Sequence, residues 1–258
     1  MKKRFLSVAL AAAVAMSATA CTSNPAESKT TAAPAETKAE ETTAAEASSE
    51  GEKKEAAADG DLITVGYAQV GAESDWRTAN TESFKSTFTE ENGYKLIFDD
   101  AQQKQENQIK AIRSFIQQDV DYIVVAPVVE TGWEAVLQEA QEAGIPVILS
   151  DRQMDVDESL YECWVGGNFI KEGETAGNWL ADYLKAQGRD GEDINIVTLQ
   201  GTIGASAQVG RTEGFGNILK QHDNWKMLDM QTGEFTQAKG QEVMESFLKS
   251  YDDIDVVV

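Results

Sequence analysis

Histidine and cysteine are scarce in this chain, which has one histidine, His222, and two cysteines, Cys21 and Cys163, among 258 residues. No His/Cys spacing typical of a metal site occurs, and no Gly-x-Ser-x-Gly segment carries a nucleophilic serine. His222 lies in a polar turn and is expected at the surface. Carboxylates are abundant, so a hydrolase with an Asp/Glu pair stays open as an alternative, although no pair stands out. We expect no enzyme, no metal and no cofactor.

Positive charge is also in short supply. The chain has 22 Lys and Arg against 44 Asp and Glu, a formal net charge of −22. Nucleic acid and anionic membrane surfaces repel a chain of this charge. We therefore expect no nucleic-acid partner, and no membrane contact other than a lipid anchor.

Residues 1–20 have the pattern of a bacterial signal peptide. A basic start is followed by an apolar stretch from Phe5 to Met16 and by small residues before Cys21, and the apolar stretch is too short for a stable membrane span. Ala18-Thr19-Ala20 fits an ordinary cleavage site, whereas Ala20-Cys21 is similar to a lipoprotein cleavage site. We favour lipidation of Cys21 over a disulfide with Cys163, which is expected to be a buried thiol.

Residues 22–60 contain no aromatic residue and no Val, Leu or Ile, and consist almost wholly of Thr, Ala, Ser, Glu, Lys and Pro. Such a segment buries too little apolar surface to offset the entropy lost on ordering. With Cys21 it predicts a lipidated, solvated tether over residues 21–60.

From Asp61 onward, short apolar runs alternate with amphipathic stretches, a pattern typical of parallel α/β structure. The apolar runs predict strands at 62–68, 95–98, 122–126, 146–149, 161–165, 194–199 and 225–230. The amphipathic stretches predict helices at 76–91, 103–118, 131–143, 172–186, 206–221 and 237–250. Gly144 is expected to end the third helix, since Gly is favoured just past a helix C-terminus.

The pattern restarts after Gly166-Gly167, which predicts two Rossmann-like α/β lobes with parallel sheets, residues 61–166 and 167–258. Residues 254–258 have the composition of a buried strand, yet no helix follows to cover it. An exposed apolar strand favours aggregation. We therefore expect the second lobe to be incomplete and the chain to be a fragment of a longer protein.

Asp151 and Arg152 directly follow a continuous apolar run, residues 145–150. In open α/β sheets, ligands bind outside the carboxyl ends of the strands. A carboxylate accepts hydrogen bonds from hydroxyl groups and a guanidinium donates to them. The pair therefore suits a neutral polyol such as a sugar.

Residues 73–77 follow the first predicted strand and face the same crevice. Trp76 offers a flat apolar face for the CH groups of a sugar, and Glu73 and Arg77 are polar neighbours. The alternative is a plain helix N-terminus with Ser74 or Asp75 as cap and Trp76 in the core. We favour ligand contact, because Arg77 is an awkward core neighbour.

The loop at 199–206 is rich in Gly, which is typical of phosphate sites, but it lacks both the GxGxxG spacing and a Walker ending. Arg211, on the helix that follows, can reach the crevice or lie exposed. Phe235, after the strand at 225–230, is either a core residue or a loop residue beside the ligand.

The sequence resembles the type I periplasmic sugar-binding proteins of ABC importers, from residue 62 to the last residue, and is most similar to the galactofuranose-binding branch. The segments that carry the resemblance are Gln69-Val70-Gly71, residues 73–77, residues 102–108, Ala126-Pro127-Val128-Val129, Thr131-Gly132-Trp133, Asp151-Arg152 and Leu199-Gln200-Gly201 leading to Arg211. Ala126 and Trp76-Arg77 depart from the pattern of ribose binders.

The resemblance implies a monomeric substrate-binding lipoprotein outside the cytoplasmic membrane, which binds a galactofuranose-like monosaccharide between two lobes and delivers it to an ABC permease. A sensor that presents the sugar to a membrane signalling protein is the alternative. The sugar site is implied to consist of Glu73, Trp76, Arg77, Asp151, Arg152 and Arg211, with Phe235 closing it from the second lobe and Asn168 near the hinge.

Overall fold

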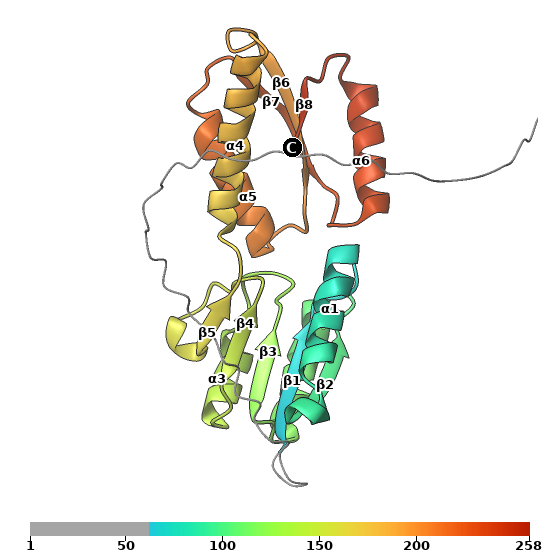
Figure 1. Ribbon diagram of the computed structural model, residues 1–258, viewed down its shortest axis with the longest axis vertical. Coiled ribbons are helices and arrows are strands. Elements are labelled where there is room, and N and C mark those ends of the chain that lie inside the picture. Colours follow the sequence, from blue (N-terminus) through green and yellow to red (C-terminus); the bar gives the residue numbers. More distant parts are fainter. Residues whose placement is uncertain (1–61) are drawn as a thin grey trace, which may run out of the picture. The chain divides into compact units, whose positions relative to one another are not determined.

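Apolar, largely β-branched runs form two parallel sheets in the computed structural model, which describes residues 62–258 (Figure 1). The first sheet has the order β2-β1-β3-β4-β5, and its strands are β1 (Ile63–Gln69), β2 (Tyr94–Asp100), β3 (Tyr122–Val125), β4 (Val147–Ser150) and β5 (Cys163–Val165). The second has the order β7-β6-β8, with β6 (Ile194–Gln200), β7 (Trp225–Thr232) and β8 (Val256–Val257). The predicted signal peptide, Cys21 and tether lie outside the described residues.

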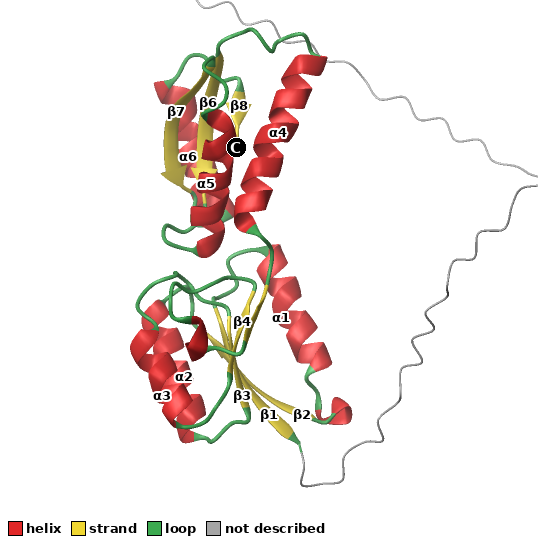
Figure 2. Cartoon of the chain, turned by 90° about the vertical axis from the view of Figure 1, so that its left-hand side faces the viewer, coloured by secondary structure: helices red, strands yellow, loops and turns green. Residues whose placement is uncertain are grey.

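Six α-helices connect the strands of the described part: α1 (Asp75–Thr87), α2 (Gln105–Gln117), α3 (Glu134–Glu142), α4 (Phe169–Ala186), α5 (Ser206–Leu219) and α6 (Gln237–Ser250). We call residues 62–166 the first half and residues 167–258 the second half; both fall within one compact unit of the chain. Figure 2 shows α1 on one face of the first sheet and α2 with α3 on the other. Within residues 62–258, none of the helices has the length and apolar character needed to cross a membrane.

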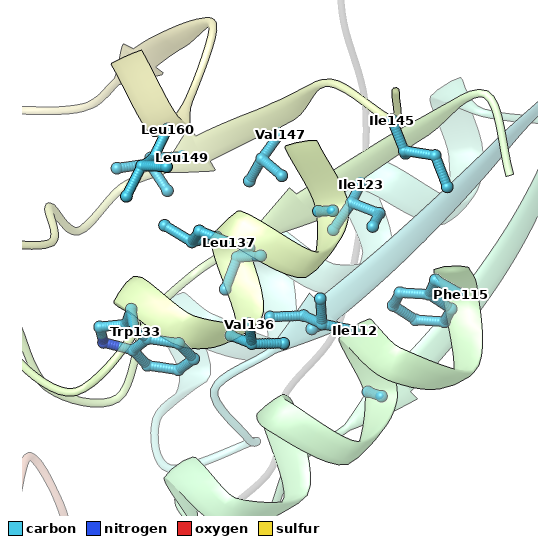
Figure 3. Packing of buried hydrophobic residues seen from close by; sticks show 14 of the residues in the cluster. Ile112, Phe115, Ile123, Trp133, Val136, Leu137, Ile145, Val147, Leu149 and Leu160 are labelled. Carbon is cyan, nitrogen blue, oxygen red and sulfur yellow. The ribbon is translucent and has the colours of Figure 1, made fainter. Parts of the chain in front are cut away.

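Each sheet separates two apolar clusters. In the first half, Ile112 and Phe115 of α2, Leu137 of α3 and Trp133 just before α3 pack on one face of the sheet (Figure 3). Phe84 of α1 and Phe88 just after it pack on the opposite face. In the second half, α4 and α5 cover one face and α6 the other. Parallel sheets need such cover on both faces, which is why strands inside the sheet, such as β1, β3 and β4, are largely apolar. The edge strands β2 and β7 also carry Lys and Asp.

Some helix boundaries of the first half differ from the sequence prediction. α2 begins at Gln105 rather than 103, because Gln102 and Gln103 have φ of 53° and 59°. α1 ends at Thr87, and a separate 3₁₀ turn ending at Gly93, φ 85°, replaces its expected last turn. Gly144, φ 72°, follows α3 as predicted.

The prediction of a buried thiol at Cys163 is wrong, since this residue is exposed. β5 lies at the edge of the first sheet, and side chains alternate along a strand. Trp164 therefore packs against the core while Cys163 and Val165 face the other way. His222, expected at the surface, is only partly exposed, because its ring stacks on that of Trp225 with centroids 4.2 Å apart.

Candidate functional site

Two strand ends of the first half bring four charged side chains together. Glu73 and Arg77 come from the turn after β1 and the first turn of α1, and Asp151 and Arg152 follow β4. The strands β1 and β4 flank β3 in a parallel sheet, so their carboxyl ends lie at the same edge. Ser74 caps α1 by accepting a hydrogen bond from the Arg77 N–H at 3.2 Å.

Arg77 is buried, contrary to the expectation that it would be an awkward core neighbour, with only 2% of its surface exposed. Its Nε donates to Glu73 Oε1 at 3.1 Å and its Nη2 donates to Asp151 Oδ2 at 2.7 Å. Two carboxylates thus offset the cost of burying this guanidinium. Trp76 stays 58% exposed, so the alternative of a core tryptophan is wrong.

Arg152 is buried beside Arg77, with 3% of its surface exposed. Its Nη2 donates to Glu73 Oε1 at 3.4 Å and its Nη1 donates to the carbonyl of Val128 at 3.2 Å. Burial, together with the neighbouring Arg77 guanidinium, lowers the pKa of Arg152 to about 10. The side chain therefore keeps its charge at neutral pH and presents it to the site.

Asp151 has a left-handed backbone, φ 64°, which turns its carboxylate toward Arg77. Its N–H donates to the carbonyl of Val165 at 2.7 Å, and its carbonyl accepts from Trp164 Nε1 at 3.1 Å. The backbone of Gly166 approaches the same carbonyl so closely that a Cβ there would overlap it. These contacts hold Asp151 in a conformation that residues with a side chain rarely adopt.

Two fully buried amides support the loops around these charges. Gln108 Nε2 donates to the carbonyls of Ala68 and Ala126 at 3.1 and 2.6 Å, and its Oε1 accepts from the Val128 N–H at 2.9 Å. Gln69 joins the end of β1 to α1 by donating to the hydroxyl of Thr81 at 3.0 Å. Gln108 therefore fixes the backbone at the ends of β1 and β3, and Gln69 ties the end of β1 to α1.

The second half supplies a more exposed ion pair. Arg211, on α5, donates from Nε to Glu172 Oε2 of α4 at 2.9 Å, and the two side chains are 48% and 44% exposed. The guanidinium also lies 5.1 Å from the centre of the Phe169 ring. α4 begins at Phe169, three residues before the predicted start, and thereby places this ring beside Arg211.

Phe235 follows β7 in the second half and reaches a charge of the first half. Its ring lies 5.0 Å from the Arg152 guanidinium, a distance at which a cation and an aromatic face attract. Arg77 stands in the same relation to Trp76, at 4.9 Å. Each arginine of the site thus stacks on an aromatic side chain.

One cavity of about 420 Å³ joins these groups. It is lined by residues of both halves: Glu73, Ser74, Trp76, Arg77, Asp151, Arg152, Gly167, Phe169, Glu172, Ala207, Arg211 and Phe235. The structure therefore brings together every ligand residue expected from sequence except Asn168, which caps α4 by accepting from the Lys171 N–H at 2.9 Å. Sequence reasoning missed Phe169 and Glu172, although the restart after Gly166-Gly167 marked their helix.

The Gly-rich loop at 201–205 contacts the first half. The carbonyl of Gly204 accepts from the Glu130 N–H at 2.8 Å, and the Ser206 hydroxyl accepts from the Gln153 N–H at 2.9 Å. The cavity therefore lies between the strand ends of two halves that also touch beside it.

The family model described as "Periplasmic binding protein domain" matches residues 65–258. The resemblance and the α/β fold class with two parallel sheets expected from sequence are thereby confirmed, as is the expectation of a binding protein rather than an enzyme. The galactofuranose-binding protein YtfQ of Escherichia coli strain K12 is 51% identical over 189 residues, which cover 73% of this chain and 58% of the relative.

Two solved structures are similar in sequence and fold. A structure from Mycobacterium smegmatis in complex with β-D-fucofuranose is 53% identical, with a TM-score of 0.72 and coverage of 76% of this chain and 64% of that one. The binding protein of the arabinose ABC transporter from Shewanella sp. ANA-3, bound to α- and β-L-arabinofuranose, is 51% identical, with a TM-score of 0.67 and coverage of 73% and 61%. The chain thus spans about three fifths of the length of these relatives.

Proposed function

Because the chain belongs to the periplasmic binding protein family, we propose that it binds a monosaccharide in the cavity between its two halves and delivers it to an ABC permease. The observation that carries this proposal is the set of charges in the cavity. Three cations, Arg77, Arg152 and Arg211, face three anions, Glu73, Asp151 and Glu172. The charges balance, which suits an uncharged ligand with many hydroxyl groups.

Two atoms of this set are buried without a hydrogen-bond partner among the described residues. They are Glu73 Oε2, an acceptor, and Arg77 Nη1, a donor. A buried polar atom that stays unpaired costs about 1–3 kcal/mol. A sugar hydroxyl both donates and accepts, so it, or a water that it holds, can satisfy either kind of atom. The exposed Trp76 and the rings of Phe169 and Phe235 offer apolar faces for the CH groups.

A five-membered sugar ring is the favoured ligand. The relative in Escherichia coli is named for galactofuranose, and the two solved structures hold fucofuranose and arabinofuranose. All three sugars share the furanose ring and differ in the groups attached to it. We therefore propose a galactofuranose-like ligand, as the sequence resemblance implied, with Glu73, Trp76, Arg77, Asp151, Arg152, Arg211 and Phe235 in contact with it.

Ligand binding is proposed to select the closed arrangement of the two lobes, with a predicted boundary near residue 166. A ligand shifts such an equilibrium only by contacts that differ between the open and closed states. The buried charges belong to the first half and Arg211 and Phe235 to the second, so the cavity is complete only when both halves are in place. The permease would then recognise the closed form.

A lipid anchor at Cys21 and a position outside the cytoplasmic membrane complete the proposal. The basic and apolar pattern of residues 1–20 and the cysteine that follows support it. Metabolic labelling with a radioactive fatty acid tests it: the full chain should carry label, and Cys21→Ala should not. Label that persists in Cys21→Ala would place the acyl chain elsewhere.

The ligand proposal is tested by melting the full chain against pentoses, hexoses and nucleosides, including D-galactose and L-arabinose, whose solutions contain some furanose. A ligand at a thousand times its Kd stabilises the folded state by about 4 kcal/mol, enough for a shift of several degrees. A shift confined to galactose and arabinose is the expected result. A panel without any shift would remove the sugar-receptor proposal.

The sensor alternative differs in partner rather than ligand. A pull-down from membranes in the presence of the sugar separates the two functions, since a permease is expected with transport and a signalling protein with sensing.

A further inference from the structure

The turn between β7 and α6, residues 232–236, is tied to the end of β6. The Gly233 N–H donates to the carbonyl of Gln200 at 2.7 Å, and the Thr232 hydroxyl donates to the carbonyl of Gly201 at 2.7 Å. The same hydroxyl accepts from the Glu234 N–H at 3.1 Å. The turn therefore has a fixed place relative to Gly201.

Two successive residues of this turn have left-handed backbones. Glu234 and Phe235 have φ of 55° and 57°, values that residues with a side chain seldom adopt. Such strain persists only where surrounding contacts over-determine it, and it gathers at ligand sites. The hydrogen bonds of Thr232 and Gly233 are contacts of this kind.

The ring of Phe235 is enclosed from two sides. On one side lies the Arg152 guanidinium, 5.0 Å from the ring centre. On the other lies Gly201, where a Cβ would overlap the end of the ring. The ring therefore contacts both the buried Arg152 guanidinium of the first half and the backbone of Gly201 in the second half.

Backbone conformation does not account for the glycine at this position. Gly204, in the same loop, has φ of 83°, whereas Gly201 has no left-handed φ, so other residues could adopt its conformation. The close approach of the Phe235 ring is the feature that a side chain at 201 would disturb.

We propose that Gly201 is a positioning residue for the cavity: it leaves the space that lets Phe235 lie over Arg152 before any ligand arrives. The inference rests on the proposed function of the cavity, and it adds that affinity depends on a residue that does not line the cavity. An aromatic ring placed in advance costs little ordering on binding.

The test is a double-mutant cycle in the full chain with Gly201→Ala, Phe235→Ala and the double variant. Calorimetry with D-galactose and L-arabinose gives Kd, and urea unfolding without sugar gives stability. Gly201→Ala should weaken binding about tenfold when Phe235 is present and by less than about twofold when residue 235 is Ala. Its effect on stability without sugar should likewise vanish in the Phe235→Ala background.

Gly191→Ala is the matched control, because a Cβ there meets no atom within 4 Å and the backbone is not left-handed. It should leave Kd unchanged and should not destabilise the protein, since Ala at a compatible position only restricts the unfolded chain. Equal effects of Gly201→Ala in both backgrounds would overturn the inference, since the glycine would then act independently of Phe235. If Gly201→Ala fails to fold, the inference predicts that the double variant folds, because the Phe235 ring is then absent. Failure of both variants to fold would also overturn the inference.

Urea unfolding of the single and double variants needs no sugar. It therefore tests the role of Gly201 even if no sugar of the panel binds. Absence of binding by the unchanged chain counts against the proposed function alone. If Gly201→Ala does not change stability in the Phe235→Ala background and no sugar binds, Gly201 still positions Phe235, and the cavity has a different ligand.

Discussion

The two walls of the cavity carry the same chemistry but are built differently. In the first half, Arg77 and Arg152 are almost completely buried, and both bond to Glu73, whose side chain is 2% exposed. In the second half, Arg211 and Glu172 form a single pair that is about half exposed. The charged side chains of the first wall are therefore fixed before a ligand arrives, whereas the exposed ion pair of the second can adjust to it.

The helices differ in the same sense. α2 and α3 pack through large side chains such as Phe115, Trp133 and Leu137. α4 and α5 pack backbone against backbone, because Gly173 and Gly214 leave no side chain between them. Arg211 and Glu172 stand on these two helices, so the glycines set the distance between the partners of the exposed pair.

Removing the charge of Glu73 is expected to have the largest effect. Glu73→Gln leaves two buried guanidinium groups short of a shared carboxylate, and breaking a buried pair costs about 3–5 kcal/mol. Urea unfolding of the full chain without sugar measures this loss. Glu172→Gln, which breaks the exposed pair, should cost less than about 1 kcal/mol. Equal losses would mean that the two walls do not differ in rigidity.

Filling the contact between α4 and α5 should come next. A Cβ on Gly214 would overlap the carbonyl of Ile170, and overpacking of this kind costs about 1–3 kcal/mol. Gly216→Ala, on the same helix but with no atom within 4 Å of its Cβ, should instead stabilise the protein by about 0.5–1 kcal/mol. Thermal melting of both variants checks the opposite signs, and a destabilising Gly216→Ala would contradict the account.

Arg211→Ala separates binding from folding. It removes an exposed pair, so stability should fall by less than about 1 kcal/mol. Binding of D-galactose or L-arabinose should weaken at least about tenfold, since a charge-assisted hydrogen bond contributes about 1.5–3 kcal/mol. Arg113→Ala is a matched control: Arg113 is 49% exposed and pairs with Glu139 away from the cavity. Unchanged Kd for Arg211→Ala in calorimetry would remove this residue from the site.

The smallest expected effect is on the loss of folding stability at low pH. The Asn195 N–H and the Arg189 guanidinium, which both donate to Asp255, hold the pKa of this second-half carboxyl below its ordinary value. A lowered pKa contributes stability that is complete above the unfolded-state value, about 4, and is lost as pH falls through the folded value. Asp255→Asn should therefore reduce the loss of stability between about pH 5 and pH 2, as measured by urea unfolding.

For Asp99 of the first half, the pKa shift has the opposite sign to that of Asp255. Burial, and then the neighbouring Asp100, raise the pKa of Asp99, so its ionised form opposes folding. Asp99→Asn should raise stability at neutral pH and make the loss in acid steeper. The same direction of change in both variants would contradict the assigned pKa shifts.

The sequence predicted the parallel α/β fold well because the strands inside the first sheet, such as β3 and β4, are nearly continuous apolar runs. It was less accurate where single residues turn the backbone, as at Gln102 and Gln103 before α2. The exposure of Cys163 depends on the position of β5 at a sheet edge, and local composition does not determine the order of strands in a sheet.

The site was predicted in part for the same reason. Asp151 and Arg152 could be found because they directly follow an apolar run. The burial of Arg77 could not, because it depends on Asp151, which lies 74 residues further along the chain. The backbone role of Gln108 was hidden as well, since its three partners lie at the ends of two other strands.

The chain segments at the ends of β1 and β3 depend on a single amide, that of Gln108. Any replacement leaves some of three backbone groups unsatisfied, and even Glu, of the same shape, loses both donors and brings a charge into a fully buried place. A library that diversifies the loops after β1 and β3 to recognise new ligands should therefore hold this position constant. Variation at Trp76, which lines the cavity and is exposed, is far less constrained, so new specificity is most accessible at that position.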